Sequence, residues 1–186
     1  MSIARDQLLR AAADFLGRRP NATQDEVAAA VGVSRATLHR QFAGRPALME
    51  ALENLAIEEM RTVLKTARLH EDSAPEALQR LVSACQPVSP YLALLYSQSQ
   101  EFDLDNTIQA WREIDEEITS FFQRGQSDGD FRPDLTAYWL TEAFYSLVGG
   151  MAWAIRAGRV AERDFDRLII ELLLHGARSP HGARAR

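Results

Sequence analysis

The stretch VAAAVGVSRATLHRQF, residues 27–42, predicts two short helices joined by a tight turn. Gly32 is expected to end the first helix, because glycine readily takes the left-handed conformation that closes helices. Ser34 is a preferred N-cap for the second helix, on which Leu38 and Phe42 have the spacing of buried residues. A short turn containing glycine between two such helices is typical of a helix-turn-helix unit, whose second helix enters the DNA major groove.

The outward-facing side chains of the second helix suit contact with DNA. Arginine can form paired hydrogen bonds with guanine, threonine can contact a thymine methyl group or a phosphate, and Ala36 would let the helix approach closely. Upstream, Thr23 and Glu26 form a capping box, and the free N–H groups that begin that helix can hold a phosphate. The candidate DNA contacts are Thr23, Ser34, Arg35, Ala36, Thr37, His39, Arg40 and Arg45. The alternative is an ordinary pair of surface helices with solvated arginines.

Charge is divided unevenly along the chain. Residues 1–45 carry seven arginines against four acidic residues, which leaves +3, whereas the whole chain has a net charge of −5. The remainder therefore carries −8. A small basic segment attached to a larger acidic one fits a nucleic-acid-binding domain on a body with another task, although short windows also fluctuate by a few charges.

Apolar residues recur at helical spacing through the rest of the chain, so we predict an all-α fold of about nine helices. The breaks between helices carry proline, glycine or short polar residues. After a long fourth helix that ends near Leu69, helices are expected at about 75–86, 90–99, 105–125, 134–157 and 162–176. The predicted organisation is a helix-turn-helix domain over residues 1–46, a larger helical domain over 47–178 and a flexible tail over 179–186.

Several functional classes find no support in the sequence. Cys85 is the only cysteine, so no internal disulfide is possible, and a reducing cytoplasm is expected. No apolar run reaches the ~20 residues that span a bilayer, and no signal peptide is apparent. Four scattered histidines and one cysteine give no zinc spacing, and no phosphate loop or nucleophile motif is present. We therefore expect a cytoplasmic protein with no catalytic centre, metal or cofactor.

The segment TQDEVAAAVGVSRATLHRQFAGRPALMEAL, preceded by LLRAAADFL, resembles the TetR family of bacterial transcription regulators. The resemblance covers about the first quarter of the chain, and the rest matches in the number and order of its helices. The matching positions are Thr23, Val27, Ala28, Gly32, Val33, Ser34, Thr37, Leu38, Phe42 and Leu48. The resemblance implies a three-helix DNA-binding head, a fourth helix that connects it to a body, and a body that binds an effector and dimerises.

The sequence departs from the family pattern at several positions. His39 stands where the family usually has a tyrosine, and Gln41 stands where another aromatic residue is frequent. Arg45 replaces a common lysine and keeps its charge, while Pro46 occupies a place often filled by an acidic residue. The loop GRRPNA lacks the glycine-plus-aromatic step that is common there. The change at His39 affects a phosphate contact carried by the tyrosine hydroxyl, which an imidazole N–H could replace.

The resemblance also implies two sites in the body. A mostly apolar cavity is expected to accept a small hydrophobic or amphipathic effector, and its candidate lining residues are Cys85, Tyr91, Gln98, Phe102, Trp111, Phe121 and Tyr145. In the family the last two helices pair with those of a second subunit. The candidate contacts there are Leu147, Gly150, Met151, Ala154, Phe165, Leu168, Ile169 and Leu172. Every residue in both sets is also compatible with ordinary intrachain core.

Together these observations predict a ligand-responsive, homodimeric, DNA-binding transcription regulator. The expected mode is repression, relieved when a small-molecule effector releases the protein from a pseudo-palindromic operator of double-stranded DNA. The alternative is an all-α small-molecule-binding or enzymatic protein whose N-terminal helices contact other proteins. Binding to DNA distinguishes the two. The sequence leaves open the effector, the operator and the choice between repressor and activator.

Overall fold

The computed structural model describes residues 5–98 and 109–177, and these residues form nine α-helices and two short 3₁₀ turns. The α-helices are α1 (Arg5–Arg18), α2 (Gln24–Ala30), α3 (Arg35–Gln41), α4 (Arg45–Ala67), α5 (Ala74–Cys85), α6 (Ser89–Gln98), α7 (Gln109–Ser127), α8 (Ala137–Arg156) and α9 (Phe165–Ala177). The 3₁₀ turns are η1 (Gln86–Val88) and η4 (Glu162–Asp164). The predicted all-α fold is confirmed, and the predicted helices occur in the predicted order.

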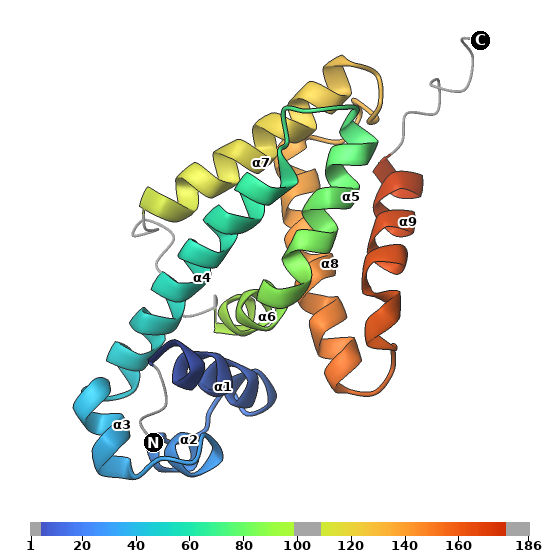
Figure 1. The fold of residues 1–186 in the computed structure, drawn as a ribbon. Coiled ribbons are helices and arrows are strands. Elements are labelled where there is room, and N and C mark those ends of the chain that lie inside the picture. Colours follow the sequence, from blue (N-terminus) through green and yellow to red (C-terminus); the bar gives the residue numbers. More distant parts are fainter. Residues whose placement is uncertain (1–4, 99–108, 178–186) are drawn as a thin grey trace.

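Helices α1, α2 and α3 form a small head at one end of the molecule (Figure 1). The turn between α2 and α3 depends on Gly32, whose φ of 75° lies in the left-handed region that favours glycine. The Val33 N–H then donates to the carbonyl oxygen of Ala28 across 3.0 Å and closes the turn. Leu38 and Phe42 are buried in the core of the head, as their spacing predicts.

Helix α4 begins beside the head and runs along the body (Figure 1). Pro46 occupies its first turn, where the N–H that proline lacks has no partner within the helix. The helix ends at Arg68, which takes a left-handed conformation with φ 45°. The predicted division between residues 46 and 47 therefore falls within the first turn of a continuous helix, which couples any tilt of α4 to the head.

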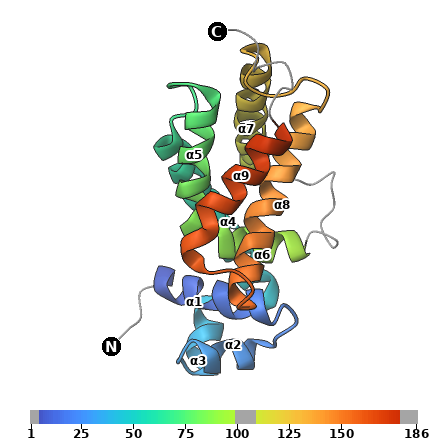
Figure 2. The same ribbon diagram turned by 90° about the vertical axis from the view of Figure 1, so that its right-hand side faces the viewer.

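Helices α5 to α9 pack around an apolar core to form the body. The rings of Phe121, Phe122 and Phe131 make a cluster with centroids 5.1 to 5.8 Å apart. Helix α8 contacts α6, α7 and α9, and Figure 2 shows α8 and α9 side by side along one face. Gly149 of α8 is buried toward Ala93 of α6. Over the described part of the chain, each helix is too short or too polar to cross a membrane.

Candidate nucleic-acid interface and helical body

Two polar caps position the helices of the candidate reading unit. At the start of α2, the Thr23 hydroxyl accepts a hydrogen bond from the Glu26 N–H at 3.3 Å, and the Glu26 carboxylate accepts one from the Thr23 N–H at 2.8 Å. Bonds from the backbone and hydroxyl of Thr23 hold the pKa of Glu26 below its usual range. At the start of α3, the Ser34 hydroxyl accepts from the Thr37 N–H at 3.1 Å. Both helices therefore begin at the residues that the sequence predicts.

The side chains of α3 separate into a buried anchor and an outward set. Leu38 is 1% exposed and fixes the helix against the rest of the head. The exposed residues of α3 are Arg35, Ala36, His39 and Arg40. A helix fixed in this way presents two guanidinium groups, an imidazole and a methyl group to solvent, which is the kind of surface that reads a major groove.

Arg35 and Thr37 have partners within the head. The Arg35 Nε lies 3.1 Å from a carboxylate oxygen of Asp25 on α2, and both side chains are exposed. An exposed pair of this kind contributes little free energy, so Arg35 can exchange Asp25 for another acceptor at small cost. Thr37 is half-buried, and its hydroxyl lies 2.9 Å from that of Ser34.

Arg45 is placed differently from the rest of the predicted DNA-contacting set. Its Nη1 donates to the carbonyl oxygen of Ala22 at 2.9 Å, and its Nη2 donates to that of Pro20. The guanidinium therefore closes the turn between α1 and α2 from the start of α4. Its position just after the recognition helix predicts a contact with a phosphate, but position along the chain gives no information about backbone carbonyls supplied by a distant turn.

Several residues predicted to line an effector cavity are packed inside the body. Cys85, Tyr91 and Phe121 are at most 3% exposed. Burial raises the pKa of the Cys85 thiol far above its usual value. Gln98 lies in the last turn of α6, where only the backbone is described, and Phe102 lies outside the described residues.

The other two predicted lining residues each bond a partly buried acid. The Trp111 indole N–H donates to Glu53 of α4 at 3.2 Å, and the Tyr145 phenol donates to Asp115 of α7 at 2.8 Å. Burial raises the pKa of both acids above their usual values, and these hydrogen bonds only partly oppose it. Burial, reinforced by the Asp115 charge, also raises the pKa of Tyr145. Sequence reasoning missed Glu53 and Asp115, although Trp111 and Asp115 are one helical turn apart on α7.

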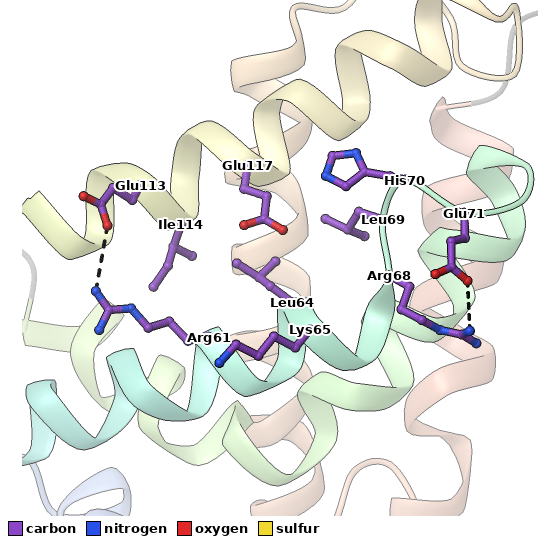
Figure 3. A pocket seen from close by; sticks show the side chains of 10 residues that line it. All are labelled: Arg61, Leu64, Lys65, Arg68, Leu69, His70, Glu71, Glu113, Ile114 and Glu117. Atoms are coloured by element: carbon purple, nitrogen blue, oxygen red, sulfur yellow. Dashed lines mark hydrogen bonds and ion pairs between the residues drawn. The ribbon is translucent and has the colours of Figure 1, made fainter.

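A separate open groove of about 370 Å³ lies between α4 and α7 (Figure 3). Its floor is apolar and includes Leu64 and Ile114, whereas its walls are charged. Arg61 reaches Glu113 across 3.8 Å between the two helices. The walls already carry opposite charges that neutralise each other, so the groove by itself indicates no particular ligand. Within the described residues, no group of three or more His, Cys, Asp or Glu side chains could hold a metal ion.

The outer face of α8 carries an exposed stripe with small residues at its centre. Trp139 and Trp153 are 60% and 48% exposed, and Ser146 and Gly150 lie between them on the same side. The spacing 139, 143, 146, 150, 153 is the alternation of four and three that brings helices together in paired contacts. Leu172 of α9, the helix that packs beside α8, is also exposed, at 59%. Exposed apolar stripes of this kind are typical of protein–protein interfaces.

The predicted dimer contacts are only partly on this surface. Gly150 and Leu172 are exposed, and the half-exposed members of the set are Leu147, Met151, Ala154 and Leu168. Phe165 and Ile169 are 1% exposed and belong to the core of the same chain, so they do not face a second subunit directly. Periodicity identified them as apolar positions but could not tell which neighbour covers them.

Relatives of the chain are regulators of transcription. No protein-family model matches it. The chain is 36% identical over 177 residues to the HTH-type transcriptional regulator NfxB of Pseudomonas aeruginosa, a match that covers 94% of this chain and 95% of that protein. It is 25% identical over 169 residues to the HTH-type transcriptional repressor LfrR of Mycolicibacterium smegmatis, covering 90% and 87% of the two chains.

Solved structures share the same arrangement of helices. The TetR-like regulator LfrR of Mycobacterium smegmatis in complex with proflavine gives a TM-score of 0.71 at 24% identity, covering 94% of this chain and 96% of that one. The TetR family regulator PfmR of Thermus thermophilus gives 0.67 at 20% identity, covering 94% and 97%. At these identities the likeness shows the fold. The match to NfxB extends along nearly the whole chain and is therefore not confined to the helix-turn-helix.

Proposed function

Because the chain belongs to the TetR family of bacterial transcription regulators, we propose that it is a homodimeric repressor that a small effector releases from its operator. Each head would place α3 in a major groove of double-stranded DNA. The two recognition helices of a dimer would lie ~34–36 Å apart, or a multiple of that spacing, over a pseudo-palindrome. The exposed surface of α8 and α9 would join the two subunits.

The observation that carries this proposal is the outward face of α3. The Ser34 N-cap fixes where the helix starts, and the buried Leu38 anchors it in the core of the head. The exposed side chains of Arg35, His39 and Arg40 can then contact bases or phosphates of the DNA. Thr23 caps α2 where its first N–H groups can meet the phosphate backbone. Arg45 contributes indirectly, because it holds the turn from which α2 begins.

The chemistry of the body supports an effector that is amphipathic and carries a positive charge. Glu53 and Asp115 lie partly buried beside the aromatic rings of Trp111 and Tyr145. A cationic aromatic ligand could stack on such rings while replacing the indole and phenol donors as the partner of the two carboxylates. The structure of LfrR with proflavine, a flat aromatic molecule that is cationic in neutral water, provides a related example.

DNA recognition is tested by selecting duplexes from a random-sequence pool with the purified full-length protein. We expect the selection to enrich a pseudo-palindrome. Footprinting of the bound protein should then show two protected half-sites on one face of the DNA helix. Failure to enrich any sequence, together with specific capture of another protein through the head, would favour the alternative that the N-terminal helices mediate protein contacts. A protein that turned over a small molecule would contradict the non-enzymatic function proposed here.

Effector response is tested with proflavine as the probe. Proflavine is expected to quench tryptophan emission. Because a flat aromatic cation also binds duplex DNA directly, its effect on operator binding is measured as the difference between the parent and the buried-acid variants, and we expect that difference to be about 5- to 150-fold. The variants Glu53→Gln and Asp115→Asn should weaken proflavine binding. Glu116→Gln is the matched control, because Glu116 is the exposed neighbour of Asp115 on α7. Equal loss in the control and in the buried-acid variants would contradict the proposed site.

A further inference from the structure

Arg156, the last residue of α8, packs against the head at Gly17 of α1. A Cβ atom built on Gly17 of α1 would lie 3.3 Å from the Arg156 Cζ and 3.4 and 3.5 Å from its two Nη atoms. These nearly equal distances mean that the guanidinium turns its flat face toward Gly17. The first of them is tighter than most contacts that a Cβ makes, so a Cβ at position 17 would displace the guanidinium by a few tenths of an ångström and a larger side chain would displace it further.

The polar environment of Arg156 is incomplete. Its buried Nη1 has no hydrogen-bond partner among the described residues. The nearby carboxylate of Asp14 is already bonded to Arg18 at 2.5 Å. Burial lowers the pKa of Arg156 below its usual value, the charge of Asp14 acts in the opposite direction, and that of Arg18 lowers it further. A buried donor without a partner costs stability, so the Arg156 guanidinium contributes less to folding than a fully hydrogen-bonded arginine would.

Helix α8 connects this contact to the interior of the body. Tyr145, which bonds Asp115 of α7, lies about three turns before Arg156 and on the same side of the helix. The same helix carries the exposed Trp139–Trp153 stripe. Figure 2 shows the lower end of α8 beside α1. A shift or rotation of α8, whether caused by a ligand near Tyr145 or by a second subunit, would therefore move Arg156 against Gly17.

We infer that Arg156 is a positioning residue for DNA recognition, whose guanidinium, lying flat on Gly17, fixes the head against α8. This inference rests on the proposed DNA-binding function. The contact is made to the last turn of α1, and the loop after that turn leads to α2 and is itself held by Arg45. Arg156 thus adds a contact from α8 to those that α6 and α4 make with α1, and it helps to set the orientation of the helix-turn-helix from the body side.

The inference is tested by separating stability from operator affinity. Arg156→Met keeps an unbranched side chain but removes the unpartnered donors, so its melting temperature should equal or exceed that of the parent. Its affinity for the selected duplex should nevertheless fall by roughly 3- to 30-fold, because the heads must be ordered during binding. Arg156→Lys keeps the charge but lacks the flat group, and it should fall by a similar factor.

Gly17→Leu approaches the same contact from the head. It should lower the affinity for the selected duplex as Arg156→Met does. The double variant Arg156→Met/Gly17→Leu should bind the duplex no more weakly than the weaker-binding of the two single variants, because both changes remove the same interaction. Arg167→Met is the charge-matched control, since Arg167 is exposed and pairs with Asp164 within its own segment at 2.9 Å. It should bind within about twofold of the parent. Sedimentation must show that every variant has the oligomeric state of the parent.

The outcomes distinguish the inference from the proposed function. Arg156→Met binding within twofold of the parent, full rescue by Arg156→Lys, or additive effects in the double variant would overturn the positioning role. A loss of affinity that merely follows a lower melting temperature would show a structural role only. A parent that selects no duplex would overturn the proposed function and this role with it. In that case, faster amide exchange at residues 14–22 in Arg156→Met would still report the Gly17 contact itself.

Discussion

The phenol of Tyr145 donates a hydrogen bond to Asp115 across 2.8 Å and thereby joins α8 to α7 inside the body. Burial raises the pKa of Asp115 above its usual value, and the neighbouring charge of Glu142 adds to this, while the bond from Tyr145 opposes it. The folded protein therefore holds the Asp115 proton more tightly than the unfolded chain. It follows that this group lowers the stability of the fold as the pH rises above about 4.

We predict that Asp115→Asn removes this loss, because an amide oxygen can still accept the Tyr145 bond without carrying charge. The melting temperature of the variant relative to the parent should rise from pH 4 to pH 7. Thermal unfolding at several pH values, followed by circular dichroism, measures the difference. Glu116→Gln, at an exposed position, should show no such trend. A difference that is constant with pH, or that falls, would show that the Asp115 carboxylate is not destabilised by burial.

Arg45→Met should destabilise the fold rather than mainly weaken a phosphate contact. The change leaves the carbonyl oxygens of Ala22 and Pro20 without their donor, which should lower the free energy of unfolding by about 1–3 kcal/mol. Arg40→Met, at an exposed position of α3, should change it by less than ~0.5 kcal/mol. Urea denaturation measures both. The opposite result would be an Arg45→Met variant with unchanged stability, whose DNA affinity depends on salt concentration with a slope lower by about one released ion. That result would show that Arg45 contacts a DNA phosphate instead.

Arg35→Ala and Arg40→Ala should each weaken operator binding by ~1–3 kcal/mol if the side chain contacts a base. Neither substitution should affect folding, since both side chains are exposed. Titration of the selected duplex at fixed salt measures the loss, and point changes in the duplex identify the base. Arg163→Ala, an exposed arginine of η4, controls for the loss of one positive charge. If the double alanine variant bound as tightly as the parent, α3 would not be the reading helix.

Gly150→Glu should dissociate the dimer without unfolding the subunit. Among residues 5–98 and 109–177, no atom outside the local backbone lies within 4 Å of a Cβ built on Gly150, so a side chain is accommodated there within the subunit. A charge at the centre of the exposed stripe would be buried without a partner in a dimer, which is costly. Sedimentation should show the parent at about twice 20.8 kDa and the variant as a monomer. Ala11→Glu, on the exposed side of α1, should leave the dimer intact; a monomeric parent would refute the interface.

The sequence alone determined the local structure of this protein. Thr23 and Gly32 predicted where α2 begins and ends, Ser34 predicted where α3 begins, and the structure confirms these positions. This succeeded because caps and left-handed turns depend on hydrogen bonds between residues at most a few positions apart. Apolar periodicity likewise predicted the helices of the body, since a helix must bury one side.

Only the tertiary structure decided which distant group meets each side chain. It directed Arg45 to the carbonyls of the α1–α2 turn, covered Phe165 and Ile169 with their own chain, and laid Arg156 on Gly17. Periodicity shows that a residue faces inward or outward, but the partner comes from a helix far away in sequence whose angle and depth are set by the packing of the whole core. The caps and the turn of the helix-turn-helix could therefore be predicted from the sequence, while the partner of Arg45 and the surfaces that connect the head to the body could not.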